Sequence, residues 1–578
     1  MTGENIEVNN KYAVEHNFAD DGQAVLYQPE RGFGFITGAN RAEVPVLKIP
    51  EANSGFLHKW WYAEKETTEI QITDRGCNWT AAKTVRRGDL EGRNLPLCYR
   101  QDVPRPGSYR LTVTVWAGED EEEVLVFVGR RRLAWRGALS AGQEVSVTTV
   151  CDVSPIIPRG QTEPLFDYSI CLAVVGKGKK TCLQSAKIEE TDACTVYIMG
   201  DSTVTDQTAD VPYAPGACYS GWGQMLGAFL PEGYCVSNHA HSGLTTESFR
   251  SEGHWDIMAS LIKPGDYCLI QFGHNDQKLA FLKADEGYSR RLERYIEELR
   301  EKGAVPVLVT PLARNSWFNP ERYNDLLADY AEAVFRIGER LCVPVLDLHG
   351  YVMEQIKEVG IEGAKQWFFP SDYTHTNDFG AYKMASFLGR GLCSIMNEKP
   401  VILGDWRPCG PFTALEPPVD CQLTPPAGNS DALEVFLSQR PDEPITRVEC
   451  LELVIQRMRF FPINVYNDLY EDVLGHETYA GTVQCAAQNH MIPPAFVKDG
   501  RLYPAQPMML QEFLAVLMPA YASRKPLKTA ETAPEGVAEY AKEAVCQAIG
   551  EGLADRDSAW EELVTRRCAA QLCRAVKI

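Results

Sequence analysis

The stretch Thr195-Val-Tyr-Ile-Met-Gly-Asp-Ser202 decides how the middle of this 578-residue chain is interpreted. The run Thr195–Met199 is apolar or β-branched almost throughout and has the length of a buried strand. Gly200 and Asp201, both common in turns, end this run, and the hydroxyl side chain of Ser202 follows at once. Because a strand that is apolar on both faces must be covered on both sides, the stretch predicts a parallel sheet between helices.

Similar apolar runs follow along the chain and alternate with helical stretches. One helix is predicted over 289–300, because Leu292, Ile296 and Leu299 fall on one face. The predicted strands are Thr195–Met199, Tyr234–Asn238, Tyr267–Phe272, Val305–Thr310 and Val343–Leu348. Strands that alternate with helices predict an α/β domain, which we assign to residues 191–400, with ligands bound beyond the carboxyl ends of the strands.

Residues 1–190, before this domain, have an all-β pattern. The predicted strands are Tyr109–Trp116, Val124–Val128, Val145–Val150 and Ser169–Val175, and turns containing Gly or Pro separate them. Short strands at this spacing predict an N-terminal β-sandwich.

Residues 401–430 form a Pro-rich stretch that predicts a linker, and residues 431–578 are predicted to be mainly α-helical. The helical part resembles S-layer homology repeats, since Ile445-Thr-Arg-Val-Glu449 matches their Thr-Arg-x-Glu helix start. A fuller repeat follows from Tyr470 to a helix over 509–518, and a third, eroded copy covers 541–550 and Thr565-Arg-Arg567. Neither copy carries the complete Thr-Arg-x-Glu signature. We expect a packing or oligomer-forming role for this part, so a homo-oligomer is left open.

Composition excludes several kinds of partner. The chain is 45% apolar and 23% charged, as in water-soluble globular proteins, and its length predicts several domains. A net charge of -21 argues against nucleic acid and against anionic membranes. The first residues lack the basic and apolar regions of a signal peptide, and the 18 cysteines include no Cys-x-x-Cys pair. We therefore expect a cytoplasmic protein with reduced thiols and without a metal site.

A serine hydroxyl is a poor nucleophile at neutral pH and needs a base. Asp372-Tyr-Thr-His375 offers one, because a carboxylate three residues before a histidine on a turn reaches the imidazole and fixes its tautomer. The alternative is that Asp378 caps the following helix and that His375 is a surface residue.

Two further candidates follow predicted strands. Asn275, in Gly273-His-Asn-Asp276, offers an amide that donates to a developing oxyanion. Gly243 offers a bare backbone N–H group, because no side chain stands in the way.

The order of these residues resembles that of SGNH (GDSL) hydrolases, which implies a flavodoxin-like α/β/α domain and catalytic roles for Ser202, Gly243, Asn275, Asp372 and His375. Within that group the chain resembles rhamnogalacturonan acetylesterases. The matching motifs are Gly200-Asp-Ser-Thr-Val204, Gly221-Trp-Gly-Gln224, Ser242-Gly243, Ile270-Gln-Phe-Gly-His-Asn-Asp-Gln277 and Thr310-Pro-Leu-Ala-Arg314.

This resemblance implies a serine esterase that removes O-acetyl groups from pectin-type oligosaccharides and uses no cofactor. Leu244 departs from the arginine that many relatives carry, which leaves acetyl-xylan or acetyl-mannan as alternative substrates. Beside such an enzyme the β-sandwich resembles galactose-binding-like domains, with a purely packing domain as the alternative. Trp222 and Trp317 are candidate sugar-stacking residues, or else part of the core. A non-catalytic carbohydrate-binding or envelope protein is the rival from another class.

Overall fold

The computed structural model describes most of the chain and divides it into two compact units. The described residues are 11–20, 22–37, 40, 61–62, 68–81, 93–157, 163–176, 180–319, 322–370, 372–408, 440–458, 460, 469–474 and 477–577. The first unit comprises residues 1–275, 284–314 and 327–421, and the second comprises residues 276–283, 315–326 and 422–578. The domain boundaries at 190, 400 and 430 stay predictions.

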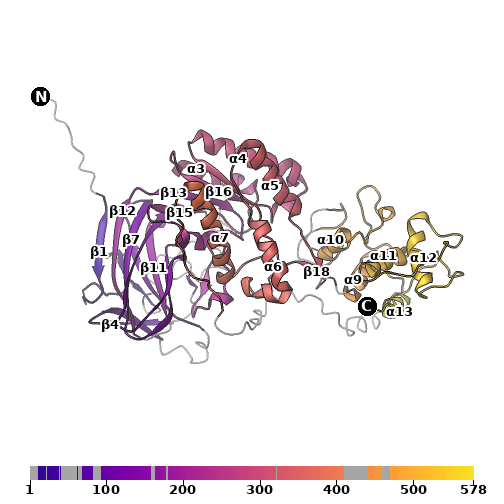
Figure 1. Ribbon diagram of the computed structural model, residues 1–578, viewed down its shortest axis with the longest axis horizontal. Helices are drawn as coiled ribbons and strands as arrows, with labels where there is room; N and C mark the ends of the chain where they lie inside the picture. The colour runs from indigo at the N-terminus through magenta and orange to yellow at the C-terminus, as the bar shows by residue number, and fades with distance from the viewer. Residues whose placement is uncertain are drawn as a thin grey trace. The chain divides into compact units, whose positions relative to one another are not determined.

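Part of the first unit is a parallel sheet surrounded by helices (Figure 1). Its strands are β13 (Cys194–Gly200), β15 (Tyr234–Asn238), β16 (Tyr267–Gln271), β17 (Val305–Val309) and β20 (Val345–Leu346). They lie in the order β15-β13-β16-β17-β20, and each neighbouring pair is parallel. Numbered along the chain this is the order 2-1-3-4-5 of flavodoxin-like sheets. The prediction of a central α/β domain is confirmed.

Helices bury both faces of this sheet. On one face the helices α3 (His254–Leu261), α4 (Ser289–Glu301) and α5 (Ala328–Leu341) share a core with alternate strand residues such as Met199 and Ile270. On the other face Ile198 lies against Gly223 of α1 (Trp222–Leu226). Because successive strand residues point to opposite faces, Ile198 and Met199 serve different layers.

Further helices of this unit are α2 (Ser248–Ser251), α6 (Leu348–Ala364) and α7 (Asp378–Met396). In α7, Ala381, Tyr382 and Ala385 share a core with Met225 of α1. The helix therefore buries one side on the layer to which α1 belongs.

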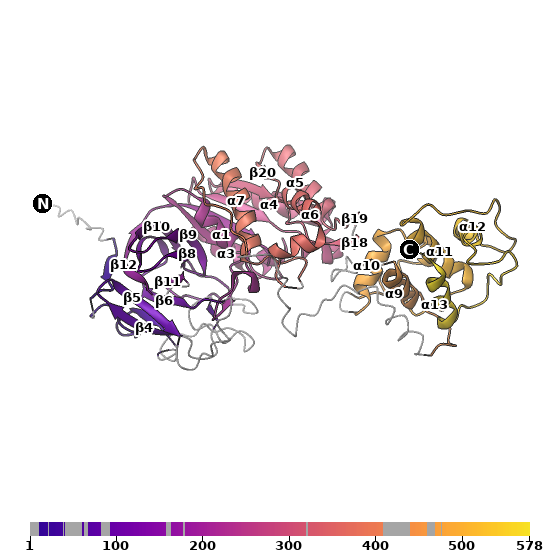
Figure 2. The ribbon, with the colours of Figure 1, turned by 60° about the horizontal axis from the view of Figure 1, so that its bottom comes forward.

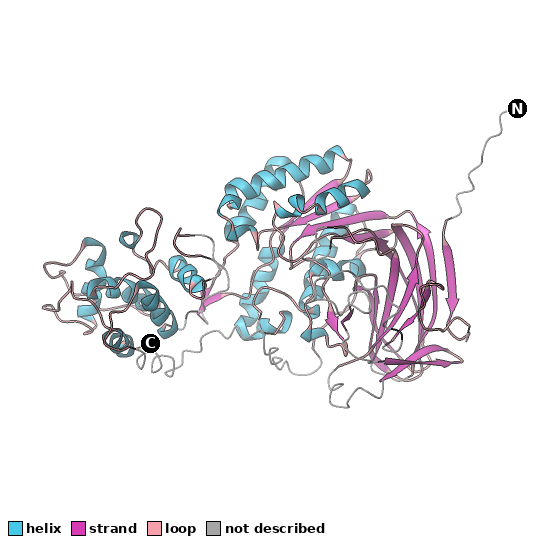
Figure 3. Cartoon of the chain, turned by 180° about the vertical axis from the view of Figure 1, so that it is seen from behind, coloured by secondary structure: helices cyan, strands magenta, loops and turns pink. Residues whose placement is uncertain are grey.

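Within 13–191 of the same unit, the described residues form mainly strands, which Figure 3 draws as magenta arrows. One antiparallel sheet has the order β2-β6-β11-β8-β9 and the other contains β10-β7-β12-β5-β4, with β1 beside β12. The bounds are β1 Ala13–Asn17, β2 Phe33–Ile36, β3 Trp61–Tyr62, β4 Thr68–Thr73, β5 Gly76–Ala81, β6 Pro96–Asp102, β7 Gly107–Ala117, β8 Glu121–Val128, β9 Arg132–Leu139, β10 Glu144–Val153, β11 Ser169–Gly176 and β12 Thr181–Thr191. Val113 and Val115 of one sheet and Val124 and Val126 of the other belong to one core. The four strands predicted here are present.

The β-rich region and the α/β region are continuous. Cys151 of β10 pairs in parallel with Val236 of β15, so that one 11-stranded sheet crosses the predicted boundary at residue 190. A second connection is a shared core, in which Phe127 and Leu133 of the β-rich region pack with Phe229 and Tyr382 of the α/β region.

The second unit is mainly helical (Figure 2). It has its own hydrophobic core. Its helices are α9 (Arg447–Arg457), α10 (Ala480–Gln488), α11 (Leu510–Ala522), α12 (Lys542–Gly550) and α13 (Arg566–Ala575), and the short strands β18 (Trp317–Asn319) and β19 (Arg322–Tyr323) also belong to it. Thr446 and Glu449 form a capping box at the start of α9.

The starts of α9, α11 and α13 lie next to one another. Thr446 bridges to Pro507, Met509 to Leu563, and Pro444 to Thr565. These are the three helix starts that the sequence pattern marked, whereas the S-layer homology itself stays a prediction. Of the predicted linker, residues 409–430 lie outside the described residues.

No helix in the described part of the chain combines the length and apolar character that a bilayer crossing requires.

Candidate active site

Ser202 lies two residues after the end of β13, at the carboxyl end of a central strand of the parallel sheet. The preceding residue holds this turn, because the Oδ1 atom of the buried Asp201 accepts hydrogen bonds from the backbone N–H (2.9 Å) and the hydroxyl (2.8 Å) of Thr203. The Ser202 Oγ atom lies 2.7 Å from Nε2 of His375. The fold therefore brings together two residues that are 173 positions apart.

His375 and Asp372 share the loop that precedes α7. Nδ1 of His375 lies 2.8 Å from Oδ2 of Asp372. The other carboxylate oxygen accepts the backbone N–H groups of Thr374 (2.7 Å) and His375 (2.8 Å), so that the carboxylate also holds the loop. The alternative reading of this segment is wrong, because Asn377 rather than Asp378 caps the helix, by accepting from Gly380.

The electrostatics of Asp372 favour its ionised form. Burial on its own raises the pKa of this carboxyl group, but the hydrogen bonds from His375 and Thr374 bring the pKa below its ordinary value. The carboxylate is thus charged at neutral pH and faces the imidazole. In this order, hydroxyl, imidazole and carboxylate form the hydrogen-bonded series that activates a serine.

Gly243 and Asn275 lie at neighbouring turns. Gly243 is exposed and has a φ of 90°, a left-handed conformation that glycine adopts without a steric cost. The side-chain amide of Asn275 donates to the carbonyl of Leu244 at 3.0 Å. Gln207 connects this turn to the serine, since its amide donates to the carbonyl of Ser202 (3.1 Å) and lies 3.5 Å from the hydroxyl of Ser242. The roles of Gly243 and Asn275 as oxyanion donors stay predictions.

Tyr219 is a site residue that the sequence analysis missed. Its ring stacks on Phe369 at 3.8 Å and meets the His375 ring edge-on at 5.7 Å. Its hydroxyl lies 3.5 Å from Oδ2 of Asp372, at the limit of a hydrogen bond. A tyrosine in a Gly- and Pro-rich loop carries no sequence pattern that marks such a contact.

The two tryptophans proposed as stacking platforms are both buried. Trp222 is 0% exposed and donates its indole N–H to Gln271 at 2.8 Å. Trp317, in the second unit, is 6% exposed and donates to Asn315 at 2.9 Å. Because a stacking platform must present a ring face to solvent, the sugar-stacking interpretation of Trp222 is wrong and the core interpretation holds.

Within the described residues, no group of three or more His, Cys, Asp or Glu side chains is placed to hold a metal ion.

A hydroxyl, an imidazole and a carboxylate in series at the carboxyl edge of a parallel sheet are the site of a serine hydrolase. Residues 198–381 match the GDSL-like Lipase/Acylhydrolase family. The chain is 36% identical over 211 residues to rhamnogalacturonan acetylesterase RhgT of Bacillus subtilis, a match that covers 34% of this chain and 88% of the relative. The chain belongs to the GDSL-like lipase/acylhydrolase family and is a serine esterase.

Two further relatives match a similar share of the chain. The chain is 35% identical over 205 residues to the probable rhamnogalacturonan acetylesterase YesY of Bacillus subtilis, covering 34% of this chain and 91% of the relative. It is 28% identical over 234 residues to a rhamnogalacturonan acetylesterase of Emericella nidulans, a match that covers 35% of this chain and 86% of the relative. All three matches cover about a third of this chain.

Proposed function

We propose that this chain removes O-acetyl groups from pectin-type, rhamnogalacturonan-derived oligosaccharides by acyl transfer to Ser202. The observation that carries the chemistry is the continuous hydrogen-bond series from Ser202 through His375 to Asp372. The similarity to three relatives with the name rhamnogalacturonan acetylesterase supports the substrate class.

In the first step His375 takes the proton of Ser202 through Nε2 while Oγ attacks the acetyl carbonyl carbon. Asp372 holds the ring with Nδ1 protonated and stabilises the imidazolium that forms. Its lowered pKa serves this role, because only the carboxylate form accepts from Nδ1.

The tetrahedral intermediate carries a negative oxygen that needs donors. In our proposal these are the backbone N–H groups of Ser202 and Gly243 and the side-chain amide of Asn275. The amide of Asn275 donates to the carbonyl of Leu244 in the free protein, and in our proposal it also donates to the oxyanion when the ester is bound. Catalytic hydrogen bonds of this kind often form fully only in the complex.

The intermediate collapses when His375 returns the proton to the sugar oxygen, and the deacetylated alcohol leaves. Water, deprotonated by the same imidazole, then attacks the acetyl-enzyme and releases acetate. The hydroxyl, imidazole and carboxylate end in the protonation states in which they began.

For the other parts of the chain we propose the roles that their sequence patterns suggest. Residues 1–190 act as a galactose-binding-like β-sandwich, and residues 431–578 as degenerate S-layer-homology-like repeats. We also propose a cytoplasmic location, which is supported by the sixteen described cysteines, none of which forms a disulfide.

The test measures turnover of p-nitrophenyl acetate, and then acetate release from acetylated rhamnogalacturonan, xylan and mannan oligosaccharides. We expect activity for the wild type and for Ser260→Ala, an exposed serine of α3, and near-complete loss for Ser202→Ala. If acetate is released faster from rhamnogalacturonan than from xylan or mannan oligosaccharides, the proposed substrate class is supported. Faster release from xylan or mannan would make that polysaccharide the substrate instead. A wild type that is inactive on every ester contradicts the proposal.

A further inference from the structure

A buried arginine from the β-rich region reaches the loops that carry the catalytic residues. Arg131 lies in the turn between β8 and β9, which the sequence Gly129-Arg-Arg-Arg132 forms. Its side chain is 0% exposed, and its φ of 55° is uncommon for a residue other than glycine. A fully buried cation in an unfavourable backbone conformation persists only where its surroundings hold it.

The guanidinium group uses every donor that it has. An arginine carries five N–H groups in a fixed plane. Nη1 donates to both oxygens of Asp378, at 2.9 and 2.8 Å, and Nε donates to the carbonyl of Gln207 at 3.1 Å. Nη2 donates to the carbonyl of Tyr219 at 2.7 Å and to the side chain of Gln224 at 3.1 Å. The geometry thus fixes four separate points at once.

One of these partners leads to the nucleophile. Gln207, whose carbonyl accepts from Arg131, donates its own amide to the carbonyl of Ser202 at 3.1 Å. The amide of Gln224 also donates to the Gln207 carbonyl, at 2.9 Å. Arg131 is therefore two hydrogen bonds from the backbone of Ser202.

Two other partners lead to the base. Asp378 is the first residue of α7, three positions after His375, and is itself fully buried. Tyr219 packs edge-on against the His375 ring, and its hydroxyl lies beside Asp372. Next to it, Ser220 and Thr376 exchange two hydrogen bonds, of 3.0 and 2.6 Å.

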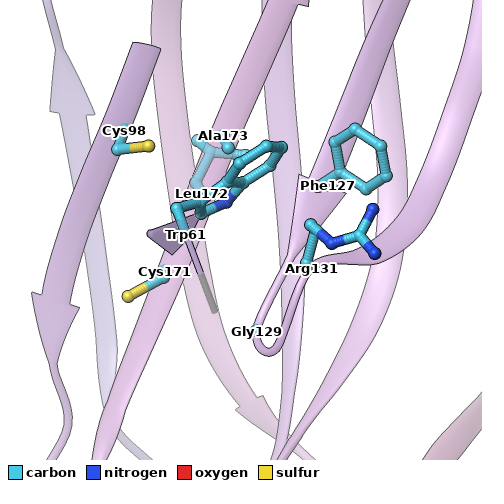
Figure 4. Close-up of a pocket in the computed structure, with 8 residues that line it drawn as sticks. All are labelled: Trp61, Cys98, Phe127, Gly129, Arg131, Cys171, Leu172 and Ala173. Carbon is cyan, nitrogen blue, oxygen red and sulfur yellow. The ribbon is translucent and has the colours of Figure 1, made fainter. Parts of the chain in front are cut away.

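Aromatic rings complete the surroundings of this cation. The guanidinium carbon lies 5.9 Å from the ring centroid of Trp61 and 6.0 Å from that of Tyr213. Figure 4 shows Arg131 beside Phe127 and Trp61, among the residues that line a small pocket. The hydroxyl of Tyr213 donates to Asp378 as well. Aromatic side chains thus surround the Arg131–Asp378 ion pair.

We infer that Arg131 is a positioning residue of the esterase, which sets the distance between the Ser202 loop and the His375 loop from outside the segment shared with the family. This inference rests on the proposed function. The family match covers residues 198–381, so Arg131 lies outside the matched segment. Displacing a catalytic group by about 1 Å costs up to roughly a hundredfold in rate.

A purely structural ion pair is the competing explanation, and two variants separate the two. Arg131→Lys keeps a cation beside Asp378 but lacks the planar fork that reaches Gln207 and Tyr219. The double variant Arg131→Met/Asp378→Asn removes both charges of the pair. Because no unpaired charge is left buried, we expect this variant to fold.

The matched control is Arg100→Met. Arg100 is also buried, and it pairs with Asp102 at 2.9 Å and with Asp167 at 2.8 Å within the β-rich region. Its loss removes an ion pair of the same kind without touching a catalytic loop.

The experiment measures kcat and KM for p-nitrophenyl acetate, together with urea unfolding, for wild type and all variants. We expect a kcat lowered about tenfold to a hundredfold, with KM changed less than threefold, for Arg131→Lys and for the double variant. Arg100→Met loses stability but keeps its kcat under conditions where it is folded. A folded double variant with the kcat of the wild type overturns the inference. An Arg131→Lys variant with the kcat of the wild type overturns it as well.

The two proposals fail in different ways. If the wild type turns over the ester, Ser202→Ala does not, and the Arg131 variants match the wild type, only the positioning role is overturned. If Ser202→Ala is as active as the wild type, the proposed function fails and the inference falls with it.

Discussion

Ser202, His375 and Asp372 owe their arrangement to very short-range causes. Ser202 lies two residues after the end of β13. One carboxylate oxygen of Asp372 accepts backbone N–H groups of its own loop, and this orients the other oxygen, Oδ2, toward the imidazole of His375. These local constraints explain why the sequence alone could place all three residues in one candidate site, while their catalytic roles stay predictions. The contact between Ser202 and His375 depends on the order of the strands, which only the assembled sheet provides.

Replacing Asp372 with asparagine tests the tautomer argument. In one of its orientations, the amide of asparagine donates an N–H group to Nδ1 of His375, which favours the wrong tautomer of the imidazole. The neutral amide also cannot stabilise the positive charge of the imidazolium. We expect kcat to fall on the order of ten-thousandfold for Asp372→Asn, measured with p-nitrophenyl acetate. Asp256→Asn, an exposed position on α3, serves as the control and retains full activity. A loss of less than about tenfold contradicts the assigned role.

Removing the Asn275 amide tests the oxyanion assignment. For Asn275→Ala we expect kcat to drop about a hundredfold or more. Stability should fall by only about 1 kcal/mol, because one hydrogen bond to the Leu244 carbonyl is lost. Asn489→Ala loses a similar bond, to the Cys485 carbonyl, and controls for stability alone. Equal activities of the two variants would remove Asn275 from the mechanism.

At the scale of helices and strands, most elements near the site could be predicted from local patterns. The five parallel strands and the helix over 289–300 were found because apolar periodicity is a property of each segment by itself. The role of Arg131 could not be, since three arginines at a turn are ordinarily solvated. Likewise, Trp222 is placed in the core by Gln271, a residue of a distant strand.

Helix α3 adds a pH dependence to stability. Burial lowers the pKa of His254 to about 4, so the folded protein binds a proton there only well below the pH at which the unfolded chain does. The stabilising contribution is present above about pH 6.5 and is lost as the pH falls toward the folded pKa. For each proton that only the unfolded chain binds, the free energy of unfolding falls by about 1.4 kcal/mol per unit decrease in pH.

The measurement is urea unfolding of wild type and His254→Phe between pH 7 and pH 4.5. We expect the free energy of unfolding to fall with pH for both proteins, and less steeply for the variant by about 1 kcal/mol per unit near pH 5. Parallel curves would show that His254 takes up its proton in the folded state.

At the scale of the first unit, the esterase fold is completed by the β-rich region. The relatives match about a third of this chain, yet here the parallel sheet continues into β10 and the layer around α1 and α7 shares a core with Phe127 and Leu133. The change of pattern near residue 190 predicted a new domain. Packing across it depends on contacts distant in sequence, which no local pattern records.

Removing residues 1–190 therefore has a definite expected effect. Residues 191–408 alone would expose Phe229 and leave the buried Asp378 without Arg131, and the unpaired carboxylate by itself costs about 3–5 kcal/mol. We expect this fragment to be poorly soluble or to unfold at a much lower temperature than the full chain, as followed by circular dichroism. A fragment with the melting temperature and esterase activity of the full chain contradicts this view.

The central claim is that Ser202 is the activated nucleophile, and covalent labelling tests it most directly. The full chain is treated with a fluorophosphonate, which reacts with activated serines, and the modified residue is located by mass spectrometry of peptides. We predict one adduct, on Ser202, that forms in proportion to the loss of esterase activity and is absent from Ser202→Ala. Esterase activity that survives complete labelling of Ser202, or that disappears with an adduct on another residue, would contradict the account.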